Sequence, residues 1–241
     1  MSTKTAFVAL ATVVWSAIAF GCNADDDPLP AGTGGGGTSP PATGGTTADG
    51  ATAGADTAGS MDVQAGGYVK APPWNGYAWT AASATGSTIT PPDYSDVDTL
   101  TKLCAQGSVA AMSDYSGTGM IGVNVNQEQA GTDPPKQTWT PASIASGGIT
   151  VNVHNAGGST IRVQIQAPGG DTDGTKRWCA PVTVFDQAIT IPWSDFNTMC
   201  WNDQGAAYAG EALESVIIIV PGENQAVVNF DFCLNALSLA Q

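Results

Sequence analysis

The sequence predicts an all-β fold: an antiparallel β-sandwich, in the form of a jelly roll, behind a disordered tether. Segments that alternate apolar and polar residues indicate half-buried strands. Turns rich in Gly, Pro and Asp separate these segments, and no amphipathic helix of useful length interrupts them. Many short strands without helices are typical of two packed antiparallel sheets. The alternating segments are 121–126, 149–154, 161–166 and 228–232, and the more continuously apolar 213–220 predicts a central strand covered on both sides.

Residues 1–21 have the layout of an export signal. Lys4 supplies a positive charge, and an apolar stretch over residues 6–20 follows, too short for a typical membrane span. Gly21 directly before Cys22 resembles the lipobox of bacterial lipoproteins, in which the cysteine thiol is lipidated, although Ala19 stands where leucine is usual. We therefore expect Cys22 to carry a lipid anchor. The alternative is ordinary secretion, with Cys22 left as a spare thiol.

Residues 22–66 have the composition of a tether. Gly, Thr, Ala, Pro and Asp dominate, and from Asn23 onward there is no aromatic residue, so this segment cannot bury enough apolar surface to offset the entropy of ordering it. The remaining residues 67–241 suffice for one domain with a hydrophobic core. We expect an exported protein, anchored by lipid to the outer membrane or cell surface.

The charge balance excludes two classes of partner. Seven basic residues stand against 21 acidic ones, giving a net charge of −14. Nucleic acid binding requires a basic face, and docking on anionic lipids requires a polybasic patch. We therefore expect no nucleic acid partner, and membrane contact through the lipid anchor alone.

The five cysteines fit this layout. If Cys22 is acylated, an even set of four remains, and outside the cytoplasm four cysteines normally form two disulfides. These four are Cys104, Cys179, Cys200 and Cys233. Three pairings are possible; Cys179 with Cys200 closes a short loop and is the pairing we favour there. A single histidine and no CxxC pair argue against zinc.

The C-terminal third carries a more specific pattern. The segment 189–196, with Pro192-Trp193 near its end, leads to Cys200-Trp201, then to the apolar 213–220 and the alternating 229–232. This order resembles the galactose-binding-like jelly rolls of non-catalytic carbohydrate-binding modules in bacterial glycan-degrading enzymes, over roughly residues 68–238. The resemblance implies that an early strand adjoins the last one, and hence that Cys104 pairs with Cys233. Modules of this kind often hold a structural Ca²⁺, for which the turn holding Asp171 and Asp173 offers carboxylates without matching a full calcium loop.

The polar positions of the alternating strands suggest a ligand-binding face. They hold amide, imidazole and guanidinium groups, which donate and accept hydrogen bonds with little net charge, as sugar hydroxyls require. The candidates are Asn124, Asn126, Asn152, His154, Arg162, Gln164 and Gln166. Because the side chains of Ile161, Val163 and Ile165 must face the core, Arg162, Gln164 and Gln166 project together from the other face. Whether the other strands share that sheet is open.

Aromatic rings near that face could stack on sugar rings. Trp178 and Trp201, with Trp74 and Tyr208, lie in predicted loops or at strand ends, whereas Trp79 and Trp193 are expected in the core. The expected partner is a neutral or uronic polysaccharide. The alternatives are that the amides only tie loops together, that His154 is an ordinary surface histidine, and that Arg162 forms a salt bridge with Asp231 or another acid.

Three functions remain open. The first is a surface-tethered, non-catalytic carbohydrate-binding lipoprotein, and the second is a structural or adhesive envelope lipoprotein without a small ligand. The third, a glycan-degrading enzyme, is disfavoured because the sequence has one histidine, no nucleophile elbow and no carboxylate pair singled out by its spacing. A concave groove lined by amides and an exposed Trp favours the first. A flat polar face with every Trp buried favours the second.

Overall fold

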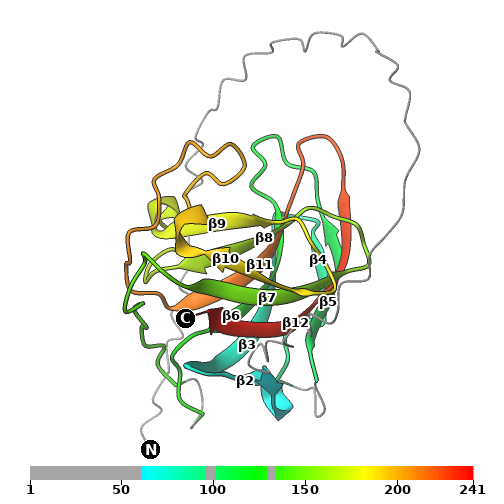
Figure 1. Ribbon diagram of the computed structural model, residues 1–241. Coiled ribbons are helices and arrows are strands. Elements are labelled where there is room, and N and C mark those ends of the chain that lie inside the picture. Colours follow the sequence, from blue (N-terminus) through cyan, green and yellow to red (C-terminus); the bar gives the residue numbers. More distant parts are fainter. Residues whose placement is uncertain (1–60, 96–100, 130–133, 241) are drawn as a thin grey trace, which may run out of the picture. The chain divides into compact units, whose positions relative to one another are not determined.

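The computed structural model describes residues 61–95, 101–129 and 134–240. Cys22, the predicted export signal and the predicted tether as far as residue 60 lie outside this part of the chain. The described residues form two antiparallel sheets (Figure 1), which confirms the predicted all-β sandwich. Helical structure among them is limited to three 3-10 turns, η1 (Ala65–Gly67), η2 (Gly174–Lys176) and η3 (Trp193–Asp195). None of the described helices is long and apolar enough to cross a membrane.

The larger sheet has seven strands in the order β1-β2-β3-β6-β11-β8-β9. Every neighbouring pair in it is antiparallel. Its strands are β1 (Asp62–Val63), β2 (Tyr68–Ala71), β3 (Trp74–Ser83), β6 (Thr118–Asn124), β8 (Ile161–Gln166), β9 (Arg177–Val182) and β11 (Ser215–Pro221).

The smaller sheet has five strands in the order β10-β7-β12-β5-β4. All of its pairs are antiparallel as well. Its strands are β4 (Thr88–Thr90), β5 (Leu103–Val109), β7 (Gly148–Asn155), β10 (Ala188–Pro192) and β12 (Val228–Ala240).

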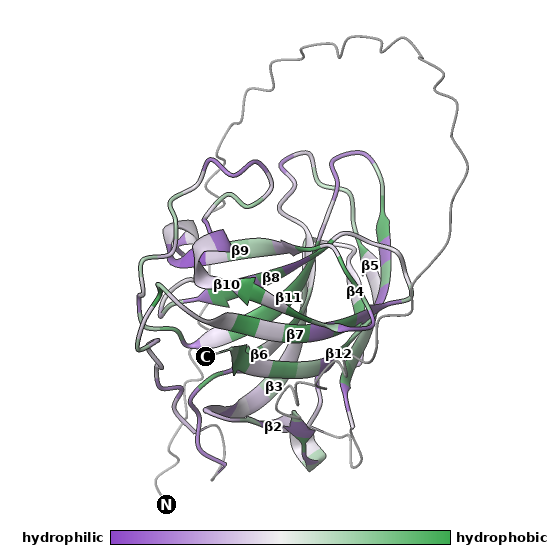
Figure 2. Cartoon of the chain, viewed as in Figure 1, coloured by the Kyte–Doolittle hydropathy of each residue, from purple (hydrophilic) through white to green (hydrophobic). Residues whose placement is uncertain are grey.

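The core lies between the two sheets and is built from alternate residues of each strand. On β8 the buried core residues are Ile161, Val163 and Ile165, as the alternation predicted. Strand β11 lies between β6 and β8, and Ile217, on the face away from the core, is buried as well. The prediction of a central strand covered on both sides is therefore confirmed. Figure 2 shows the green core stretches of the strands against the more polar loops at the top of the view.

The sandwich begins earlier than its composition suggests. Residues 61–66 fall within the segment assigned to the tether, yet Val63 pairs with Val69 in the first hairpin of the larger sheet. The side chains of Met61 and Val63 are buried in the core. Two isolated apolar residues among Gly, Ala and Gln are too weak a pattern to indicate an edge strand.

Both predicted disulfides are present. Cys104 on β5 is bonded to Cys233 on β12, which lies directly opposite it in the smaller sheet. Cys179 on β9 is bonded to Cys200 in the loop that follows η3. Because Cys179 lies on the larger sheet, the second bond holds that loop against the sheet.

Candidate functional site: a groove on the outer face of the larger sheet

Strand register decides which side chains share the outer face of the larger sheet. Gln164 pairs with Ile217 on β11 and with Cys179 on β9, and Ile217 pairs in turn with Gly122 on β6. Directly opposed residues of antiparallel strands point to the same side of a sheet. Two residues away on each strand, and therefore on the same face, Arg162 pairs with Ile219. The expected common face of Arg162, Gln164 and Gln166 therefore exists, and it is the face opposite the core.

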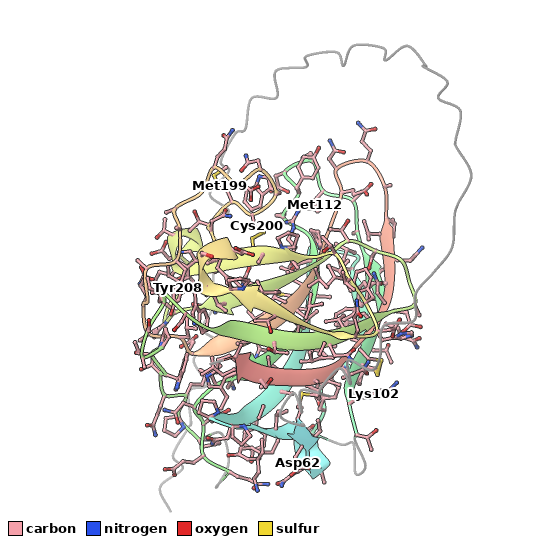
Figure 3. All side chains as sticks on the ribbon, in the orientation of Figure 1. Asp62, Lys102, Met112, Met199, Cys200 and Tyr208 are labelled. Carbon is pink, nitrogen blue, oxygen red and sulfur yellow. A yellow bond between two sulfur atoms is a disulfide. The ribbon has the colours of Figure 1, made fainter. Side chains whose placement is uncertain are left out.

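Three loops border part of this face and, together with it, form a groove of about 380 Å³. This volume lies within the usual range of small-molecule sites. The floor comes from β6, β8, β9 and β11, and the walls come from the loops around residues 115, 174 and 200. The lining residues are Tyr115, Ser116, Thr118, Arg162, Gln164, Gly174, Arg177, Cys179, Thr198, Trp201, Ile219 and Pro221. Figure 3 shows Met112 and Met199, which belong to two of these loops, at the same end of the molecule.

The groove holds two exposed aromatic side chains. Trp201 is 57% exposed and Tyr115 is 59% exposed, and both line the groove. Every other aromatic side chain in the described part of the chain is buried or half-buried. Tyr115 also has a φ of 56°, in the left-handed region that residues other than glycine rarely adopt. Such backbone strain gathers at functional sites, and here it accompanies an exposed ring.

The loop that carries Trp201 is fixed to the sheet at several points. The disulfide joins Cys200, the residue before Trp201, to Cys179. Asn197 and Cys179 exchange two backbone hydrogen bonds of 2.8 and 3.1 Å, and the Thr198 N–H donates to the Ala206 carbonyl at 3.0 Å. The loop therefore presents Trp201 from a restrained backbone. The guanidinium carbon of Arg162 lies 5.6 Å from the centre of the Trp201 ring, a cation–π contact.

Three of the nine predicted binding residues, Arg162, Gln164 and Trp201, line the groove. Gln164 is 8% exposed, and its amide donates a long hydrogen bond of 3.4 Å to Gln166. The amide oxygen of Gln164 accepts no hydrogen bond from the described residues, so it can still accept one from a ligand.

Asn124 and Asn126 are engaged in structural hydrogen bonds. Asn124 is buried; it accepts from the Trp79 indole at 3.2 Å and donates to the Gln127 amide oxygen at 2.7 Å. Asn126 lies just beyond β6 and donates to the Thr138 carbonyl at 2.9 Å. These bonds fit the alternative in which the amides tie loops together.

Asn152 and His154 lie on β7, in the smaller sheet. Their neighbours in sequence, Val151 and Val153, are buried in the core, so Asn152 and His154 project from the opposite side of the sandwich. His154 Nδ1 lies 2.6 Å from Asp186 Oδ1. These two residues therefore do not widen the platform formed by Arg162 and Gln164.

The positions of several tryptophans, Trp178 and Trp79 among them, differ from the expectation. Trp178 is 4% exposed and packs edge to face against the buried Tyr208, with 5.2 Å between ring centres, so it offers no open face to a sugar. Trp74 is buried, and Trp193 is in the core, as expected for Trp193.

Trp79 is not in the core: its ring lies on the outer face of the larger sheet, over Gly122. Only a glycine there leaves room, since a Cβ on Gly122 would stand 2.1 Å from the ring.

The turn with Asp171 and Asp173 serves a local role. The Asp173 carboxylate accepts from the Thr175 N–H at 3.0 Å and from its hydroxyl at 2.6 Å, which caps η2. These hydrogen bonds lower the pKa of Asp173. Within residues 61–95, 101–129 and 134–240, no three His, Cys, Asp or Glu side chains gather as a metal site would require.

The lining residues that the sequence did not point to include Tyr115, Thr118, Arg177 and Thr198. Tyr115 stands in a turn, Asp114-Tyr115-Ser116-Gly117, where an aromatic residue is unusual, and this signal was available. Arg177 adjoins Lys176 in a chain with seven basic residues, which was a second signal. Thr118 and Thr198 have no distinctive pattern, and only the fold brings them to the groove.

The sequence matches no protein-family model, and no curated protein is significantly similar to it. The solved structures that this chain resembles include two of low sequence identity. One is a family 11 carbohydrate-binding module from Clostridium thermocellum, in complex with a β-1,3-1,4-mixed-linked tetrasaccharide; it is 12% identical, with a TM-score of 0.40, over 68% of this chain and 87% of that one. The other is the glycoside hydrolase domain of Endo-D from Streptococcus pneumoniae R6, 14% identical, with a TM-score of 0.32, over 70% of this chain and 22% of that one.

Proposed function

We propose that this protein is an exported, non-catalytic polysaccharide-binding protein whose ligand lies in the groove of the larger sheet. The observation that carries the proposal is the placement of the aromatic rings. Tyr115 and Trp201 are the two exposed aromatic side chains of the described residues, and both line one groove together with the amide of Gln164. Aromatic rings pack on the apolar faces of sugars, and amides hydrogen-bond their hydroxyls.

The chemistry of the groove supports binding rather than hydrolysis. A typical glycosidase places two carboxylates on either side of the scissile bond. The lining residues of this groove include no Asp or Glu. Two disulfides support export, because such bonds persist in oxidising environments outside the cytoplasm.

Glycan binding is tested with the full-length chain on a glycan array, followed by calorimetry with each glycan that binds. We expect Trp201→Ala to weaken binding at least about 30-fold, because truncating a central aromatic anchor costs about 2 kcal/mol or more. We expect Asn152→Ala, on the opposite side of the sandwich, to leave the affinity unchanged. Thermal unfolding of both variants checks that the fold is intact.

Two results would oppose the proposal. Absence of binding to any glycan would favour a structural or adhesive lipoprotein. If Trp201→Ala retains glycan binding and Asn152→Ala abolishes it, the binding site lies on the smaller sheet.

The membrane anchor is a second part of the proposal. Cys22, outside the described residues, follows an apolar stretch and Gly21, and it leaves the four paired cysteines as an even set. We expect Cys22→Ser to release the protein from the membrane fraction in cells. If the variant is processed and remains in that fraction as the wild type does, Cys22 is not the anchor.

A further inference from the structure

We propose that the groove recognises a carboxylate-bearing sugar, a uronate, within the polysaccharide, with Arg162 as the carboxylate contact and Arg177 as a second contact further along the chain. This inference rests on the proposed function and deepens it. It follows from where the protein places its positive charge.

The chain has only two arginines, Arg162 and Arg177, and both line the groove. The protein as a whole carries a net charge of −14. No acidic residue lines the groove, so these two guanidinium groups are its only charged lining groups. A cationic groove on an otherwise acidic protein selects for a ligand with local negative charge.

Arg162 lacks the partner that a half-buried cation normally has. None of the ion pairs among the described residues involves Arg162, and none of its N–H groups donates a hydrogen bond to them. The salt bridge to Asp231 considered from sequence is therefore not formed; Asp231 lies on β12 of the smaller sheet. Partial burial lowers the pKa of the Arg162 guanidinium, and the group remains charged because an arginine in a protein does not deprotonate.

A ligand carboxylate would supply the missing partner. A guanidinium offers paired donors that match the two oxygens of a carboxylate, and such a bidentate pair offsets the desolvation of both groups. The cation–π contact with the Trp201 ring stabilises the guanidinium but leaves its N–H groups free to donate hydrogen bonds to a ligand. The Trp201 ring can also stack on the sugar that bears the carboxylate. Arg162 and Trp201 would then recognise the same sugar unit.

Arg177 stands further along the groove than Arg162. It pairs with Gln166, four residues along β8 from Arg162, which corresponds to about 13 Å between their positions along the strand. Its guanidinium passes close to Gly174, where an added Cβ would stand 3.4 Å from Nη2. We therefore assign Arg177 to a second acidic residue of an extended chain.

Two acidic residues adjoin lining residues in the sequence: Asp114 precedes Tyr115, and Asp173 precedes Gly174. Asp114 accepts from the Ser116 N–H and hydroxyl, and Asp173 does the same with Thr175. These bonds lower the pKa of both carboxyls, so both stay ionised. We therefore expect a polysulfated chain, with several charges on each sugar, to bind less well than a chain with one carboxylate on each sugar.

The test compares matched ligands on the full-length protein by calorimetry. The probes are tetrasaccharides of galacturonate, glucuronate and mannuronate, each paired with the same tetrasaccharide after reduction of its carboxyls to alcohols. We expect at least one uronate to bind at least about tenfold more tightly than its reduced partner. Arg162→Met is expected to remove this preference, Arg162→Lys to reduce it, and Lys102→Met, at an exposed charge just before β5, to leave it unchanged.

The outcomes separate this inference from the proposed function. Equal affinity for a uronate and its reduced partner, or binding of neutral glycans alone, would overturn the inference and leave polysaccharide binding intact. Absence of binding to every probe and to a neutral glycan array would overturn both. Equal or tighter binding of poly-glutamate or dextran sulfate would also overturn the inference, because it would show general attraction to anions. If Arg162→Met does not fold, the wild-type comparison and Arg177→Met decide.

Discussion

The two outer faces of the sandwich carry similar polar residues but differ in how those residues are paired. On the smaller sheet several polar groups bond to one another: Thr150 to Thr190 at 2.8 Å, Asn235 to Asn152 at 3.3 Å, and His154 to Asp186 at 2.6 Å. On the larger sheet the groove holds Arg162 without an acid and Gln164 with an open amide oxygen. Unused hydrogen-bonding capacity, rather than residue type, distinguishes a binding face from a solvated one.

The faces also differ in shape and in their disulfides. The Cys104–Cys233 bond joins two adjacent strands of the smaller sheet, whereas the Cys179–Cys200 bond fastens a loop that walls the groove. The first bond therefore stabilises the fold, and the second also positions Trp201.

Removing the two disulfides separately should give the largest effects and sharpen this comparison. The bond Cys104–Cys233 spans 129 residues and Cys179–Cys200 spans 21. In the chain-entropy model their loss costs about 5 and about 3 kcal/mol of the free energy of unfolding, respectively.

For glycan affinity we expect the reverse order, because only the Cys179→Ser, Cys200→Ser variant frees the Trp201 loop. Urea unfolding and calorimetry measure the two quantities. Equal loss of affinity in both variants would show that the loop is not special.

Removing one amide from each face should give a moderate difference. Gln164→Ala removes a hydrogen-bonding group that lines the groove, and we expect affinity to fall about fivefold, which corresponds to about 1 kcal/mol. Asn152→Ala removes an amide on the smaller sheet and should leave affinity unchanged. Calorimetry on both variants measures the difference, and equal effects would contradict the assignment of the groove.

Removing the histidine pair should give the smallest effect. His154 and Asp186 have exposed side chains, and an ion pair at such a position contributes about 1 kcal/mol or less. We expect His154→Ala to change the free energy of unfolding by no more than that amount and to leave glycan binding as it was. A large loss of binding would give the smaller sheet a functional role that this account does not assign.

Local patterns predicted much of the fold. The alternation over 161–166 coincides with β8, and the apolar 213–220 largely coincides with the buried strand β11. Both disulfide pairs were predicted, one from loop length and one from the resemblance to jelly rolls. Periodicity reports which face of a strand is polar, and that is a local property.

Sheet membership could not be read in the same way. The segments with Asn152 and with Gln164 have the same alternation, yet long-range pairing places them in different sheets. Trp79 was expected in the core because a large ring beside apolar residues is usually buried, whereas Gly122, distant in sequence, opens a place for it on the outer face. The groove itself depends on loops around Tyr115 and Trp201, whose conformations no periodic pattern encodes.

The central claim is that the ligand lies against Trp201 and Arg162 on the outer face of the larger sheet. The most direct measurement is a nuclear magnetic resonance titration of the isotope-labelled protein with the tightest-binding oligosaccharide, following the indole N–H of Trp201, the Nε–H of Arg162 and the amide of Asn152. We predict large shifts for the first two groups and none for Asn152. Shifts at Asn152 and His154, with Trp201 and Arg162 unmoved, would contradict the account.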